Sequence, residues 1–114
     1  MNMSEYTIAG LLERMPEAFV PERAAGVNAT VQLHLSGPGG GDWVITIANQ
    51  QCKTEAGTIP NPSLTFLASA QDCLDIFTGK LDGMKAFMLG KLQLRGDMSL
   101  AMKLVSYFNV NRSF

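Results

Sequence analysis

The stretch FTGKLDGMKAFMLGKLQLRGDMSLAMKL, residues 77–104, decides which fold this 114-residue chain can adopt. It contains two Gly-Lys-Leu triplets, and in each the glycine stands where a helix can end. A Gly-Asp pair follows the second triplet, and Asp97 is of a type that caps helices. The pattern predicts a short helix over about 82–89, a strand over 91–95 and a final helix over about 97–108.

Methionine is concentrated in the same region, where residues 84–104 hold four of the seven methionines of the chain. Methionine is flexible and recurs on surfaces that accept several apolar shapes. In the final helix the apolar arc is wider than packing against one neighbour requires. Each of these residues taken alone is compatible with an ordinary core, whereas two over-apolar helices above a sheet indicate a lined cavity.

The residues before this region predict one helix followed by a sheet. Apolar residues recur at the spacing of one helical face from Ile8 to Met15, with Ser4 as a candidate cap and Pro16 as the expected end. Alternating patterns then predict strands over 28–36 and 42–49, and two further strands are expected near 52–56 and over 63–68. Ser69 is expected to cap a helix that reaches Phe77.

The outward positions of these strands carry polar side chains, which include Gln32 and His34. One polar face is typical of a largely antiparallel sheet, so the helices must cover the other face. The sequence therefore predicts a two-layer α+β fold with a five-stranded, largely antiparallel sheet.

Composition predicts a single globular domain over residues 1–114, since 46% of the residues are hydrophobic and 17% are charged. The N-terminus lacks the pattern of a signal peptide, and no apolar run approaches the ~20 residues that span a bilayer. The C-terminus is not a peroxisomal S-K-L signal. We therefore expect a cytoplasmic protein.

The charges are unevenly distributed. Residues 79–114 contain six bases and two acids, although the net charge of the chain is −1. This excess is too small, and too poor in interleaved aromatic residues, to indicate nucleic acid. It is compatible with transient contact with an anionic membrane surface.

No constellation of residues indicates catalysis or a cofactor. Cys52 and Cys73 form no CxxC motif and have no histidine cluster nearby, which argues against zinc and predicts two reduced thiols. The only histidine, His34, has no signalled nucleophile partner. The glycine run 37–41 leads into a strand, so it predicts a hairpin connection and not a phosphate loop. We expect no metal, no cofactor and no enzymatic activity.

Three features stand out between about Gly26 and Phe108: the hairpin 39-GGGDWVI-45, Gly57, and the helix–GKL–helix–GKLxxxGD–helix pattern of residues 77–104. With these features the sequence resembles the type-two sterol carrier proteins, a family of lipid-transfer domains. The turn 49-NQQ-51 departs from the Asp-Gly or Asn-Gly that is common there. The resemblance implies a five-stranded sheet covered on one face by helices that enclose an apolar tunnel.

The resemblance also implies non-covalent binding of a sterol, fatty acid, fatty acyl-CoA or similar lipid by a monomer or weak dimer. Carried over by position, the residues expected in or near the tunnel are Phe77, Met84, Phe87, Met88, Met98 and Met102. The set of expected ligand-binding residues is completed by Phe66, Leu92 and Val105. The alternative is a non-catalytic interaction or dimerisation module that presents the same apolar helical face to a protein partner.

Overall fold

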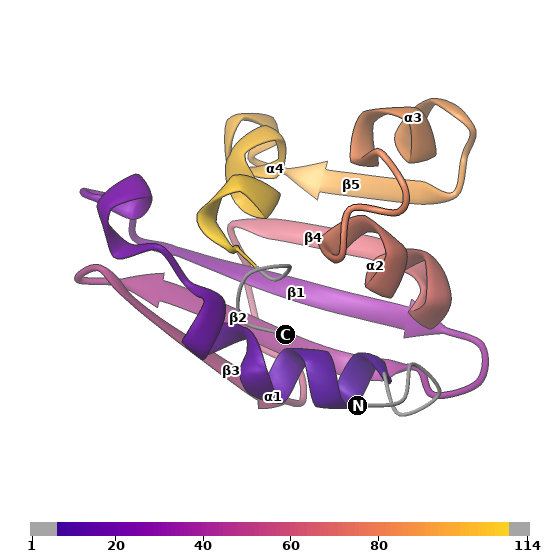
Figure 1. Cartoon of the computed structure of the whole chain (residues 1–114), viewed down its shortest axis with the longest axis horizontal. Coiled ribbons are helices and arrows are strands. Elements are labelled where there is room, and N and C mark those ends of the chain that lie inside the picture. The colour runs from indigo at the N-terminus through magenta and orange to yellow at the C-terminus, as the bar shows by residue number, and fades with distance from the viewer. Residues whose placement is uncertain (1–6, 110–114) are drawn as a thin grey trace.

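A computed structural model describes residues 7–109 and contains one five-stranded sheet (Figure 1). The strand order is β3-β2-β1-β4-β5. β1 and β4 are parallel and the other three neighbouring pairs are antiparallel, so the sheet is mixed. The strands are β1 (Ala29–Ser36), β2 (Gly41–Ala48), β3 (Gln51–Ala56), β4 (Leu64–Ser69) and β5 (Leu92–Gly96).

Four α-helices form a layer over one face of the sheet, which confirms the two-layer α+β prediction (Figure 1). The strand register places Val31, Leu33 and Leu35 of β1 beside Leu64, Phe66 and Ala68 of β4 on this inner face, and all six are buried. The helices are α1 (Ile8–Ala18), α2 (Ala70–Phe77), α3 (Gly83–Met88) and α4 (Met98–Leu104), together with the 3₁₀ turns η2 (Pro21–Ala24) and η3 (Val105–Tyr107).

Side-chain caps begin three of these helices, and the sequence predicts the caps at Ser69 and Asp97. The Ser69 hydroxyl accepts a hydrogen bond from Asp72 N at 3.0 Å, and Asp82 Oδ1 accepts one from Met84 N at 3.0 Å. Asp97 Oδ1 accepts from Leu100 N at 3.1 Å. Each cap satisfies a backbone donor that has no partner within its helix, so the caps set where α2, α3 and α4 begin.

The predicted end of the first helix at Pro16 is wrong, because α1 passes through Pro16 and ends at Ala18. A proline inside a helix removes the amide that would bond the carbonyl four residues earlier, here that of Leu12. The Thr54 hydroxyl of β3 donates to this carbonyl at 2.7 Å, so the group is satisfied from outside the helix. At the other end of α1 the cap is Thr7, whose hydroxyl accepts from Gly10 N at 3.0 Å, while Ser4 lies outside the described residues.

The final helix is also shorter than predicted. α4 ends at Leu104, and the chain continues as the 3₁₀ turn η3 to Tyr107. The Tyr107 carbonyl accepts a hydrogen bond from Val20 N at 2.8 Å, and the Phe108 ring lies 5.6 Å from that of Phe19. These contacts hold the end of the described chain against the segment that follows α1.

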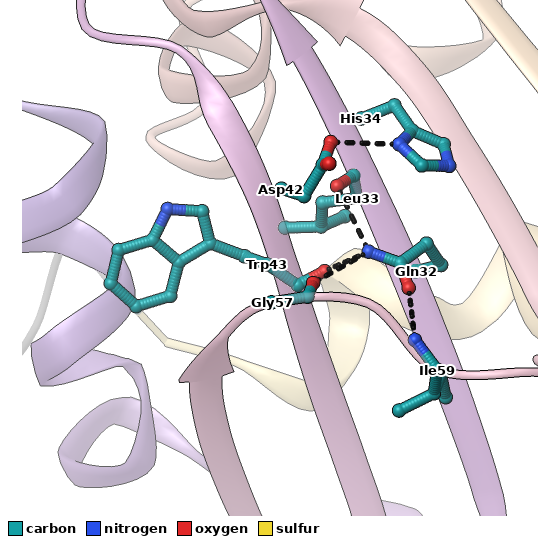
Figure 2. Close-up of polar contacts among 7 residues, drawn as sticks. All are labelled: Gln32, Leu33, His34, Asp42, Trp43, Gly57 and Ile59. Carbon is teal, nitrogen blue, oxygen red and sulfur yellow. Dashed lines mark hydrogen bonds and ion pairs between the residues drawn. The ribbon is translucent and has the colours of Figure 1, made fainter.

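The prediction for Gln32 on the outer face of the sheet is wrong, because its side chain was expected to contact solvent and is buried. Gln32 is only 2% exposed. Its Nε2 donates to the carbonyls of Trp43 at 3.1 Å and Gly57 at 3.0 Å, with a longer contact to Leu33 O at 3.4 Å (Figure 2). Its Oε1 accepts from Ile59 N at 2.9 Å. The side chain therefore fastens the loop after β3 to β1 and β2.

Candidate functional site

A cavity of about 470 Å³ opens between α3 and α4 and the inner face of β4 and β5. Such a volume is typical of sites for small molecules. Among residues 7–109, every lining residue is apolar or glycine except Asp82. The cavity is lined by Phe66, Ile76, Gly79, Leu81, Asp82, Gly83, Met84, Phe87, Leu92, Leu94, Met98, Ala101, Met102, Leu104 and Val105.

Strand register builds the floor of the cavity. Phe66 of β4 stands opposite Leu94 of β5, and Ala68 stands opposite Leu92. Because directly opposed residues point to the same face, Phe66, Leu92 and Leu94 all point towards the helices. Phe66 and Leu92 are almost fully buried, and Leu94 is half-buried. The floor is thus a fixed apolar surface.

The rim of the cavity is apolar and exposed. In α3 only Ala86 is buried, whereas Met84 is 53% and Phe87 is 42% exposed. On the opposite rim, in α4, Met102 is 71% exposed. No other part of residues 7–109 covers these large apolar side chains, and such a pair of uncovered apolar helices is typical of a surface that binds something else.

Seven of the nine residues predicted to bind ligand line this cavity: Phe66, Met84, Phe87, Leu92, Met98, Met102 and Val105. The structure places the other two elsewhere. Phe77 is buried between the rings of Phe66 and Phe108, at centroid distances of 6.0 and 6.1 Å, and packs in the core. Met88 is 79% exposed and is not among the lining residues.

Sequence reasoning missed several lining residues as site residues. Two of them could have been found from spacing. Leu94 lies two residues after Leu92 and so points to the same face of β5, and Ala101 lies one helical turn after Met98. Leu81 lies in the connection between α2 and α3, where no periodic pattern operates. Asp82 was placed only at the start of the helix predicted over about 82–89, and its place at the cavity depends on how α3 sits over the sheet.

The thiols and the histidine lie outside this cavity. Burial raises the pKa of the Cys52 thiol to about 12 and raises the pKa of the Cys73 thiol further, so both stay protonated at neutral pH. His34 Nδ1 lies 2.8 Å from Asp42 Oδ1 on the outer face of the sheet (Figure 2). Within residues 7–109 no serine or cysteine forms a hydrogen bond with this histidine.

Across residues 7–109, no helix has the length and apolar character needed to cross a bilayer.

Comparison with known proteins gives a consistent picture. The sequence model of the SCP-2 sterol transfer family matches residues 8–109. Hydroxysteroid dehydrogenase-like protein 2 of Bos taurus is 37% identical over 88 residues, which cover 72% of this chain and 20% of that protein. Sterol carrier protein 2 of Rattus norvegicus is 36% identical over 72 residues, which cover 61% of this chain and 13% of that protein.

Among solved structures, palmitated SCP2L2 from Aedes aegypti superposes with a TM-score of 0.65 at 24% identity, covering 89% of this chain and 93% of that one. This likeness establishes the shared fold. The chain spans about one fifth or less of the length of the curated relatives described above, so it corresponds to one domain of those longer proteins.

Proposed function

The chain belongs to the SCP-2 sterol transfer family, and on that premise we propose that it holds the apolar part of a lipid in the cavity between α3, α4 and the β4–β5 edge. The ligand would be a sterol, a fatty acid, a fatty acyl-CoA or a lipid of similar size. The observation that carries the proposal is the apolar lining of a cavity of about 470 Å³ whose rim is left uncovered.

The driving force would be apolar burial. Sequestering a methylene from water contributes about 0.8 kcal/mol, so a long chain gains affinity without many polar contacts. The fixed floor of Phe66 and Leu92 would provide contact surface, and the flexible rim methionines would adapt to the shape of the ligand. A ligand seated there would also cover side chains that are now exposed.

We further propose that the domain binds its ligand without changing it chemically, and that the expected cytoplasmic location and monomeric or weakly dimeric state apply. In longer relatives such a domain would present or store a lipid for the rest of the protein. Contact with an anionic membrane would bring the cavity to its donor or acceptor. Lys85 and Lys103 are exposed on the two helices that form the rim, beside the exposed methionines.

A series of saturated fatty acids of increasing length tests lipid binding. Displacement of a fluorescent fatty-acid probe should show affinity rising about fourfold per methylene, the equivalent of ~0.8 kcal/mol, until the cavity is full. Palmitate is a suitable member of the series, since the Aedes aegypti neighbour was solved in palmitated form. Affinity that does not depend on chain length would refute a cavity that holds the chain.

Met102→Arg and Met88→Arg form a matched pair that locates the ligand. Both methionines are highly exposed, at 71 and 79%, so neither substitution should lower the melting temperature by more than a few degrees. Only Met102 lines the cavity. Met102→Arg should therefore weaken binding at least tenfold, while Met88→Arg should leave it within about twofold when no membrane is present. Equal effects of the two substitutions would mean that the ligand lies elsewhere.

The exposed rim also favours a second candidate, a module that docks a protein partner or a second copy through the same helices. Native mass spectrometry of the purified protein separates the two. A monomer that carries lipid supports the lipid-binding proposal, whereas a tight dimer free of lipid supports the interaction module.

A further inference from the structure

Asp82 is the one charged residue among the described residues that line the cavity. Asp82 is exposed as well as lining the cavity, which favours a place at the mouth, where the polar end of a bound lipid would come to rest. The other lining residues offer no side-chain hydroxyl, amide or cationic group. The polar end of the ligand would therefore meet a single side-chain functional group.

That group is a hydrogen-bond acceptor with a free oxygen. Oδ1 accepts from Met84 N at 3.0 Å and so fixes the carboxylate at the start of α3. Within residues 7–109, Oδ2 has no hydrogen-bond partner. An ionised carboxylate cannot donate a hydrogen bond, so it favours a ligand group that donates and disfavours one that is negatively charged.

The nearby cations form no ion pair with Asp82 within residues 7–109. Lys80 and Lys85 flank it in the sequence and are exposed. Neither forms an ion pair with it or with another of the residues that the structure describes. A fatty-acid carboxylate at the mouth would thus approach a like charge that is held in place, whereas the hydroxyl of a long-chain alcohol could donate to Oδ2.

We propose that Asp82 determines the headgroup specificity of the cavity and selects lipids whose polar end is uncharged and donates a hydrogen bond over lipids that end in a carboxylate. The inference rests on the proposed lipid binding and refines it. Chain length would provide most of the affinity, and Asp82 would choose among chains of equal length.

The test compares 1-hexadecanol with palmitate, two probes with sixteen carbons and different polar ends, at about pH 8. Affinities are measured by displacement of the same fluorescent probe for the unmodified protein, Asp82→Asn and Asp97→Asn. Asparagine caps helices as well as aspartate does, so both variants keep their helices. Asp97 is the matched control, since it caps α4 in the same way, loses the same charge and does not line the cavity.

We expect the unmodified protein and Asp97→Asn to bind hexadecanol more tightly than palmitate. In Asp82→Asn the affinity for palmitate should rise at least fivefold, while that for hexadecanol stays within about twofold. A preference for palmitate in the unmodified protein would assign the headgroup to the exposed lysines and overturn the proposal. A palmitate gain that is equal in the two variants would also overturn it, since only net charge would then matter.

The failure of the broader proposal would look different. If neither probe bound and affinity showed no dependence on chain length, lipid binding itself would be wrong. If both probes bound with the expected dependence on length, but with the same ratio in Asp82→Asn as in the unmodified protein, only the role of Asp82 would be refuted.

Discussion

Replacing Gln32 with leucine tests how the outer face of the sheet is held together. Leucine has a similar size but can neither donate nor accept hydrogen bonds. The substitution removes three bonds of 2.9 to 3.1 Å, two donated by Nε2 to Trp43 O and Gly57 O and one accepted by Oε1 from Ile59 N. At about 1 kcal/mol each, the expected loss is about 3 kcal/mol in the free energy of unfolding.

The longer contact to Leu33 O, at 3.4 Å, adds little, because the two hydrogens of the amide already have closer acceptors. A loss of this size should lower the melting temperature by more than about 10 °C. Urea unfolding gives the free energy, and amide hydrogen exchange reports on the Ile59 N–H directly. Exchange there should accelerate sharply, because its acceptor has been removed.

Gln32→Glu provides an internal control of the same shape. The second carboxylate oxygen would face the carbonyls of Trp43 and Gly57 without a hydrogen to donate, so this variant should be less stable than Gln32→Leu at neutral pH. Protonation of a buried carboxyl restores a donor, so the difference should shrink as the pH falls towards 4. Retention of stability within about 1 kcal/mol in Gln32→Leu, or unchanged Ile59 exchange, would refute the assigned role.

Three further predictions concern other parts of the fold. Gln50 has a positive φ of 59° in the two-residue turn between β2 and β3, so Gln50→Gly should raise the free energy of unfolding by roughly 0.5–1 kcal/mol in urea titrations. Thr54→Val removes the donor to the Leu12 carbonyl and should lower the free energy of unfolding by about 1–2 kcal/mol. The loss should be much smaller in a Pro16→Ala background, because the restored amide of residue 16 can then donate to the Leu12 carbonyl. Burial raises the pKa of the Cys73 thiol and shields it from reagents, so Ellman's reagent at about pH 8 should modify Cys73 only as fast as the protein unfolds. Rapid modification of the folded protein would contradict the burial of Cys73.

Local pattern was enough to predict much of this structure. Alternation of apolar side chains predicted β1, β2 and β5, and the Ser69 and Asp97 caps followed from residue type and position. These features depend on interactions within a few residues of sequence. The Met-rich pattern over 84–104 also indicated where an apolar cavity would lie, since one helical face follows from spacing alone.

Contacts between distant segments decided the remainder, because a local pattern does not reveal which group will arrive from elsewhere in the chain. α1 continues through Pro16 since Thr54 supplies a donor from β3, and Gln32 is buried since the loop after β3 folds over it. Met88 and Met102 look alike in the sequence and are both exposed, and only the placement of α3 and α4 over the sheet makes Met102 line the cavity while Met88 does not. The same placement makes Asp82, which caps α3, the one charged residue among the described residues that line the cavity, because only tertiary packing puts a cavity beside the start of that helix.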